Sequence, residues 1–319
     1  MSTGDSMSMV PRSPLDASTG QDASQGRGPL VSDASSGSAE SSELPALIVV
    51  EKAGIEPEGI EYDPEHHRFL LGSRTTGTVY AVADDGAITP FVEDPDLVSI
   101  LGIEVDEMTD RLLVVNNGVL GGGDCLLGIY DLDSGERQAL VDLGDPGTLV
   151  NDVTVDAEGT AYITNTFNGR IYAVSTDGAV SIFASPDELG TTLSLNGIVY
   201  HPDGYLLVAG FNRGVIYRVP IDDPSMASEL ALDIDIAGPD GLVLHPNGEL
   251  VVSSFLSQQV RSIRSEDGFV TGNVTSSAQL TEQITTVAIR GVAVYAIRPQ
   301  LDKEREKPVI EQVDLRPVL

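Results

Sequence analysis

Residues 149–163 read LVNDVTVDAEGTAYI, and this stretch decides the fold. It opens with an Asn-Asp pair, after which apolar and polar residues alternate through Val155, a pattern that predicts a strand. The turn at 156–159 ends in glycine, as a tight hairpin requires, and a second strand begins at Ala161. The stretch is therefore interpreted as a β-hairpin with polar residues at its entrance.

Variants of this hairpin recur along the chain. They read EGIEYDPEHHRFLL (58–71), GIEVDEMTDRLLVV (102–115), NGIVYHPDGYLLVA (196–209), DGLVLHPNGELVVS (240–253) and the degenerate TVAIRGVAVYAI (286–297). One equivalent residue of each copy falls at 59, 102, 152, 197, 241 and 286, so the intervals are 43, 50, 45, 44 and 45 residues. Six β-patterned copies at this period predict an all-β fold, a six-bladed β-propeller.

The ends of the chain indicate how the ring closes. The last blade has a third predicted strand at 309–315 and no fourth, whereas the segment ALIVV (46–50) precedes the first blade without a partner. We expect this N-terminal strand to pair into the last blade, which removes an exposed sheet edge. Residues 45–319 then form one propeller domain. Residues 1–44 are rich in Ser, Gly, Asp and Pro and are predicted to be a disordered leader.

The chain is strongly acidic. Asp and Glu outnumber Lys and Arg by 49 to 18, giving a formal net charge of −31, which argues against nucleic acid or an anionic membrane as a partner. Because the acids are spread over every blade and only three lysines occur, we favour a surface adapted to high salt over a dedicated surface for multivalent cations. No apolar segment is long enough to cross a membrane or to serve as a secretion signal, which predicts a cytoplasmic protein.

The residues just before the innermost strands carry the chemistry. In blade order they are Glu58, Leu101, Asn151, Asn196, Asp240 and Thr285. The loops that enter the innermost strands share one face of a propeller, so these side chains are expected at the mouth of the central channel. Two carboxylates and two amides, completed by water, form the oxygen set that a hard cation requires.

Calcium fits this set best, with Mg²⁺ or Mn²⁺ as alternatives. Zinc is disfavoured because the set offers no nitrogen or sulfur ligand. The competing interpretation is that Asn and Asp are ordinary turn residues entering strands. A Glu at one of the four places, and the convergence of all four on one axis, favour the metal. The four histidines (66, 67, 201 and 245) fall in turns on the opposite face and are expected to be solvent-exposed.

The motifs around these residues resemble a known family. Glu58 in PEGIEYDP, Asn151 in VNDVTVDAEGTAYI, Asn196 in LNGIVYHPDGYLLVA and Asp240 in GPDGLVLHPNGEL look like the senescence-marker-protein/gluconolactonase (regucalcin-like) family. More distantly they look like paraoxonases and the squid-type diisopropylfluorophosphatase. The resemblance covers about 46–315, and it implies a six-bladed propeller with a catalytic divalent metal, usually calcium, at the channel mouth.

Carried over to this chain, the resemblance implies that Glu58, Asn151, Asn196 and Asp240 bind the metal. It further implies that Asp240 is the candidate general base and that Asp152 supports the ligands from behind. The implied reaction is hydrolysis of a lactone or related ester, in which the cation polarises the carbonyl and a carboxylate takes the proton of the attacking water.

One departure from the gluconolactonases bears on the substrate. Those enzymes carry an Arg two residues before the blade-three Asn, where this chain has Leu149. The loops between second and third strands supply the predicted substrate pocket, which comprises Arg74, Asn117, Phe167, Phe211, Arg213 and Phe255. Three Phe predict a partly apolar mouth, with Arg213 or Arg74 available for an oxyanion or carboxylate, although packing between blades explains any single Phe equally well.

We therefore expect a small-molecule lactone or ester that is more apolar than an aldonolactone. Two other functions are compatible with the sequence. A calcium- or ligand-binding propeller without catalysis would bind metal and hydrolyse nothing. A protein-interaction scaffold would have no ordered metal and a large exposed apolar patch.

Overall fold

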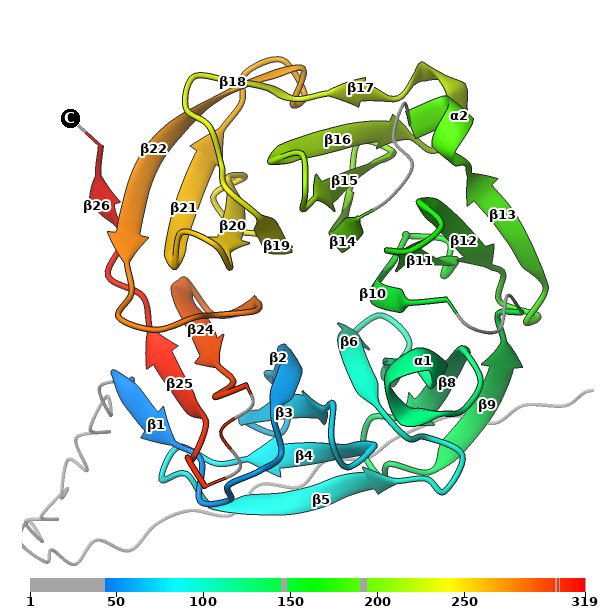
Figure 1. Ribbon diagram of the computed structural model, residues 1–319, viewed down its shortest axis with the longest axis vertical. Helices are drawn as coiled ribbons and strands as arrows, with labels where there is room; N and C mark the ends of the chain where they lie inside the picture. The colour runs from blue at the N-terminus through cyan, green and yellow to red at the C-terminus, as the bar shows by residue number, and fades with distance from the viewer. Residues whose placement is uncertain (1–43, 145–147, 190–193, 302, 304, 319) are drawn as a thin grey trace, which may run out of the picture. The chain divides into compact units, whose positions relative to one another are not determined.

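The computed structural model describes residues 44–144, 148–189, 194–301, 303 and 305–318. In this part of the chain six β-sheets stand around a central channel (Figure 1). The innermost strand of each sheet contacts the innermost strands of its two neighbours, and the sixth contacts the first. The predicted all-β, six-bladed propeller is confirmed. The leader predicted for 1–44 lies outside the described residues, apart from Leu44.

Each blade has four main strands, which we call first to fourth in order from the channel outward. The innermost strands are β2 (Pro57–Asp63), β6 (Ile100–Asp106), β10 (Val150–Val155), β14 (Leu195–His201), β19 (Pro239–Leu244) and β23 (Val287–Arg290). The second strands are β3 (Arg68–Ser73), β7 (Arg111–Asn116), β11 (Ala161–Asn165), β15 (Tyr205–Gly210), β20 (Leu250–Ser254) and β24 (Ala293–Arg298). The third strands are β4 (Thr78–Val82), β8 (Leu126–Asp131), β12 (Arg170–Val174), β16 (Val215–Pro220), β21 (Gln259–Arg264) and β25 (Val309–Gln312). The outermost strands are β5 (Ile88–Glu93), β9 (Arg137–Asp142), β13 (Val180–Ala184), β17 (Ser228–Glu229), β22 (Thr271–Gln279) and β1 (Leu47–Val49).

Short helical turns occur in the connections. They are α1 (Gly118–Gly121), α2 (Pro186–Leu189) and the 3₁₀ turn η1 (Pro224–Met226). Among the described residues, none of the helices has the length and apolar character needed to cross a membrane.

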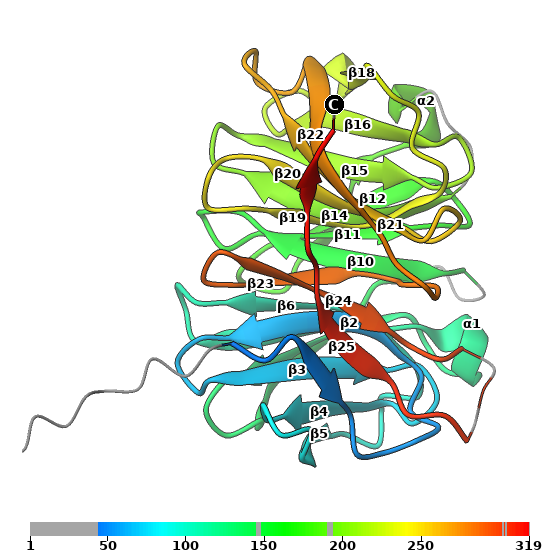
Figure 2. The same ribbon diagram turned by 90° about the vertical axis from the view of Figure 1, so that its left-hand side faces the viewer.

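Each end of the propeller pairs with a blade other than the one next to it in sequence. Strand β1 lies antiparallel to β25, with Leu47 opposite Glu311, and so forms the outermost strand of blade six. Strand β25 is shorter than the predicted 309–315, because the chain leaves blade six after Gln312 and forms β26 (Arg316–Pro317). Strand β26 pairs with β22 of blade five, whose other edge segment, β18 (Ala231–Leu232), runs parallel to β22 (Figure 2).

The apolar core of the described chain is divided into six clusters, each between two neighbouring blades. Adjacent residues of one strand feed opposite clusters, because side chains alternate across a strand. In β3, Leu70 packs against blade two and Leu71 against blade six. The same division in the other second strands explains why they read as continuous apolar runs rather than as alternating ones.

Buried aspartates cap the hairpins between first and second strands. In blades one and two, Asp63 and Asp106 each accept a hydrogen bond from an arginine, Arg68 and Arg111, at 2.9 and 2.8 Å. Each arginine then reaches a carbonyl of the next blade, at Leu132 and Gly159 respectively. The turn residues therefore join neighbouring blades as well as closing their own hairpins.

Two of the histidines occupy this turn position in blades four and five. The Nδ1 atoms of His201 and His245 accept hydrogen bonds from the backbone N–H groups of Asp203 and Asn247, each at 3.2 Å. Both side chains are half-buried, and His201 stacks on Tyr205 with ring centroids 4.4 Å apart. The expectation of solvent-exposed histidines is therefore correct for His66 and His67 and wrong for these two, which replace the capping aspartate.

The cap of blade three provides a test of stability. Asp156 is buried and accepts hydrogen bonds from the N–H groups of Glu158 and Thr160 and from the Tyr162 hydroxyl. Asp156→Ala leaves these donors without their acceptor, so we expect the free energy of unfolding to fall by about 2–3 kcal/mol in equilibrium urea titrations. Asp177→Ala, in an exposed turn of the same blade, should leave it nearly unchanged. Equal losses in both variants would contradict the capping role.

Candidate functional site

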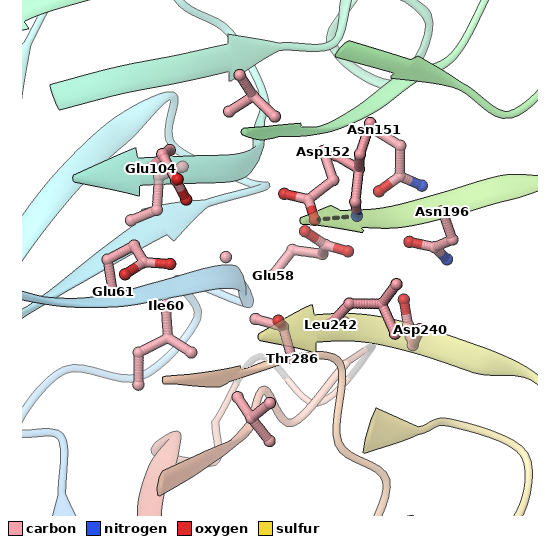
Figure 3. A pocket seen from close by; sticks show the side chains of 16 residues that line it. Glu58, Ile60, Glu61, Glu104, Asn151, Asp152, Asn196, Asp240, Leu242 and Thr286 are labelled. Carbon is pink, nitrogen blue, oxygen red and sulfur yellow. Dashed lines mark hydrogen bonds between the residues drawn. The ribbon is translucent and has the colours of Figure 1, made fainter. Parts of the chain in front are cut away.

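Backbone irregularities aim the predicted ligands into the channel. The first five innermost strands each lose their regular register near the predicted position, as between Pro57 and Gly59 in β2 and between Leu195 and Ile198 in β14. A β-bulge redirects the side chain it contains and is common beside active sites. Glu58, Asn151, Asn196 and Asp240 consequently line one cavity of about 20 Å³ at the channel mouth, together with Asp152 (Figure 3).

Glycine follows most of these positions for a steric reason. A Cβ atom on Gly197 would lie 2.1 Å from the carbonyl oxygen of Asp240, and one on Gly59 would lie 2.5 Å from that of Leu101. The missing side chain lets the innermost strands approach one another closely. Blade three is different, because Asp152 occupies the glycine position and its carboxylate accepts a hydrogen bond from the N–H of Ile198 at 3.1 Å. Asp152 therefore adds a third carboxylate to the cavity.

The amide of Asn151 presents an unpartnered oxygen. The Thr166 hydroxyl donates to the carbonyl of Leu195 at 2.6 Å and accepts from Nδ2 of Asn151 at 3.0 Å. This arrangement fixes the orientation of the amide, and its Oδ1 atom is buried without a hydrogen-bond partner. A buried amide oxygen with no donor costs about 1–3 kcal/mol. Asn151 thus brings an unpartnered acceptor atom to the lining of the cavity.

The carboxylates of the cavity are held in an unfavourable environment. Loss of solvent raises the pKa of Glu58 well above its ordinary value, Asp240 and Asp152 raise it further, and the Arg74 guanidinium lowers it. Burial and Asp152 likewise raise the pKa of Asp240, against a lowering effect of the hydrogen bond from Asn196. Burial raises the pKa of Asp152 to about 7. Such mutual repulsion is relieved by protonation or by a bound cation.

Two further carboxylates line the same cavity, and the sequence interpretation missed them. Glu61 and Glu104 lie three residues after the blade-one and blade-two positions, deeper in the channel. Burial and the neighbouring Asp152 raise the pKa of Glu104 to about 8, and burial and Glu104 raise that of Glu61. The signal was present in the repeated text EGIE and LGIE, each of which ends in Glu. The register shift in each strand adds one residue, so that side chains three positions apart can share the channel-facing side.

The carboxylates alone do not assemble a metal site. Within the described residues, no three Asp, Glu, His or Cys side chains are placed so that they could hold one metal ion together. A cation in this cavity would therefore depend on the amide oxygens of Asn151 and Asn196 and on water. The other two of the six equivalent positions that precede the innermost strands do not contribute ligands. Leu101 is apolar, and the Thr285 hydroxyl donates to the backbone oxygen of Glu58 at 2.9 Å.

The structure corrects two of the predicted pocket residues. Asn117 is fully buried, because its Oδ1 caps α1 by accepting from Val119 and Leu120, while its Nδ2 donates to the carbonyl of Val150. Arg213 is exposed, and its guanidinium contacts Glu229 on the outermost strand at 2.5 Å and the Tyr217 hydroxyl at 3.0 Å. Asn117 is therefore not available to a molecule at the channel mouth, and the guanidinium of Arg213 contacts the outermost strand of its own blade.

The other four predicted pocket residues lie in the loops that follow second strands. The backbone N–H groups of Arg74, Phe211 and Phe255 donate to carbonyls two residues before Glu58, Asn196 and Asp240 respectively. Phe211 and Phe255 are half-buried, with ring centroids 6.2 Å apart, and Phe167 is 49% exposed. Arg74 pairs with Glu56.

The raised carboxylate pKa values predict how the metal-free protein responds to pH. The native state holds protons that the unfolded chain releases, so stability should fall as pH rises from about 5 through about 8. Glu104→Gln removes part of this penalty and should raise the free energy of unfolding at pH 9 by about 1 kcal/mol or more, the value of one pKa unit. Urea unfolding with chelator at several pH values measures the slope. Exposed Glu136→Gln is the control, and equal slopes in both variants would contradict the role of Glu104.

Fold and site together define the class: a six-bladed propeller with a ring of side-chain oxygens at its channel mouth. The chain belongs to the SMP-30/gluconolactonase/LRE-like family, whose model matches residues 56–295. This match includes all four predicted ligands and confirms the family resemblance drawn from the sequence. No curated protein sequence matches the chain.

Solved structures with the same architecture differ in function. The Malassezia sympodialis allergen Mala s 1 is similar at 19% identity, with 85% of this chain and 97% of the allergen covered and a TM-score of 0.71. A luciferin-regenerating enzyme is similar at 14% identity, with 86% and 97% covered and a TM-score of 0.61. Virginiamycin B lyase from Staphylococcus aureus is similar at 14% identity, with 85% and 87% covered and a TM-score of 0.61. At these identities the likeness shows the fold alone.

Proposed function

We propose that this chain is a divalent-cation-dependent hydrolase of a lactone or related ester. The observation that carries the proposal is the unpartnered, buried Oδ1 atom of Asn151 beside the carboxylates of Glu58, Asp152 and Asp240. Family membership supports a hydrolase of the lactonase type. Because the structural relatives differ in function, the propeller fold alone does not support a hydrolase. The support comes from the site and from the family.

The residues present fit a hard cation. Glu58, Asn151, Asn196 and Asp240 would hold it through oxygen atoms, and the cavity of about 20 Å³ is large enough for about one water-sized occupant. Calcium suits this set best, because it accepts mixed carboxylate and amide oxygens together with water. When bound, the cation supplies a Lewis acid that polarises the substrate carbonyl.

Asp240 is the proposed general base. A water oxygen forms the new bond to the carbonyl carbon, the ring carbon–oxygen bond breaks, and the proton released by water passes through Asp240 to the departing alkoxide. A bound cation lowers the pKa of a carboxylate that ligates it, so Asp240 would act as a base of low intrinsic strength. The hydrogen bond from the N–H of Ile198 holds Asp152 beside the proposed cation ligands. Its negative charge favours retention of the cation.

A panel of lactones and esters tests the proposal directly. In the presence of calcium, the purified protein should hydrolyse at least one lactone of the panel and release one acid group for each substrate molecule. The amount of base needed to keep the pH constant measures this release. The non-catalytic alternative predicts calcium binding without acid release from any member of the panel. Absence of both binding and release would overturn the metal site as well.

A further inference from the structure

A hollow opens on the mouth face between blades one and two, beside the candidate site. Its volume is about 400 Å³, and its lining comprises Glu56, Arg74, Thr75, Val98 and Leu120. A volume of this order accommodates a small organic group.

The walls of the hollow are fixed to the chain segments that carry the site. Arg74 is hydrogen-bonded to the carbonyl of Glu56, two residues before Glu58. The N–H of Val98 donates to Oδ1 of Asn116 at 2.7 Å, and the next residue, Asn117, ties the α1 loop to Val150, beside Asn151. The hollow therefore keeps a defined position relative to Glu58 and Asn151.

Val98 and Leu120 of the hollow belong to blade two, a blade that contributes no charged or amide side chain to the oxygen ring. Blade two lies between Glu58 and Asn151 and contributes Leu101 where those blades contribute oxygen ligands. A molecule that approaches over blade two consequently displaces no ligand from the ring. Its reacting carbonyl would lie at the mouth, and the rest of the molecule would extend toward α1.

The outer wall of the hollow is apolar and exposed. Leu120 is 50% exposed and its neighbour Val119 is 37% exposed, on a helix of a single turn. Exposed apolar side chains that rim a cavity beside a polar site are typical of ligand contacts. The charged side chains of the hollow, Arg74 and Glu56, are paired with each other, so the hollow presents little net charge to an uncharged group.

We propose that this hollow binds the alkyl or aryl substituent of the substrate, so that the substrate class is lactones with an apolar side chain. This inference rests on the proposed hydrolase function. Leu120 and Val98 are the residues that determine specificity, and they discriminate among lactones without contacting the reacting atoms.

Two lactones that differ in one substituent test the inference. δ-Valerolactone has no side chain, and δ-undecalactone carries a hexyl group at the ring carbon that bears the ester oxygen. Leu120→Ser should lower kcat/KM for δ-undecalactone about tenfold, because a hydrophobic pocket discriminates by about this factor or more for each lost apolar contact. It should change the value for δ-valerolactone by less than about twofold. Leu120→Met should retain the preference. Met108→Ser removes a 76% exposed apolar side chain from the opposite face of the same blade and should have no effect.

Binding of cyclopentanone and 2-hexylcyclopentanone, which cannot be hydrolysed, separates this inference from the proposed function. Tighter binding of the hexyl compound to wild type, lost in Leu120→Ser, supports the hollow even if no lactone is hydrolysed, a result that would overturn the hydrolase alone. The inference is overturned if hydrolysis and binding do not depend on the hexyl group. It is also overturned if the preference for the hexyl compound is equal in wild type and Leu120→Ser. Neither outcome contradicts the proposed hydrolase function.

Discussion

Asp240→Asn is expected to reduce lactone hydrolysis by about 10³-fold or more while the propeller stays folded. The substitution removes both a proposed cation ligand and the proposed proton acceptor, and loss of a positioned base alone costs about 10²–10⁴-fold. The side chain changes by one atom type and keeps its volume, so the packing of β19 is preserved. Initial rates in saturating calcium measure the loss.

The same variant should respond in the opposite sense when metal is absent. In the metal-free wild type, Asp240 and Glu58 are buried near each other and near Asp152, which raises their pKa values and destabilises the native state at neutral pH. Asp240→Asn removes one charge from this group, so its melting temperature in chelator should exceed that of wild type. Asp235→Asn, an exposed change of the same charge in the preceding loop, should leave both rate and melting temperature unchanged. Wild-type turnover by Asp240→Asn would refute the assigned role.

Calcium is expected to stabilise the protein, and its removal to abolish activity. A ligand that binds only the native state adds about 2.7 kcal/mol at a concentration of 100 times Kd. For a domain of this size that gain corresponds to a rise in Tm of about 5 °C. Scanning calorimetry of the chelated protein, repeated over a calcium series, measures the shift, and readdition of calcium should restore hydrolysis.

Asn151→Leu is the matched variant for this experiment, because Leu101 shows that the equivalent position of blade two accepts leucine. The variant loses the unpartnered oxygen and should lose the calcium-dependent rise in Tm, while its metal-free form melts no lower than wild type. A calcium response equal to that of wild type would show that the cation binds elsewhere. No response in wild type would overturn the cation site itself.

The sequence predicted those parts of the molecule that repeat. Six hairpins at a near-constant interval place one residue of each at the same point of its blade, so Glu58, Asn151, Asn196 and Asp240 could be grouped without knowledge of the structure. Three of these four residues are followed by a glycine, and this pattern is visible in the sequence. The glycine is needed there because it allows the innermost strand of the next blade to approach closely.

The parts that could not be predicted depend on local hydrogen bonds rather than on repetition. Asn117 was expected to face a substrate, yet its Oδ1 accepts from two N–H groups of α1 and its Nδ2 donates to the carbonyl of Val150. Arg213 turns outward because Glu229 and Tyr217 lie within its reach. Loop side chains of this kind choose among several partners, and the sequence pattern does not rank them.

Ring closure also sets the order in which the site is completed during synthesis. Among the described strands of the propeller, β1 is the first to be synthesised, and it pairs with β25 of the sixth blade. The backbone of Glu58 is likewise held by Thr285 of blade six, more than two hundred positions later in the chain. Contacts of such separation form slowly, and a nascent chain folds from its N-terminus. The channel mouth is therefore finished only after translation has delivered the sixth blade, and a truncated nascent chain carries its oxygen ligands without the frame that brings them together.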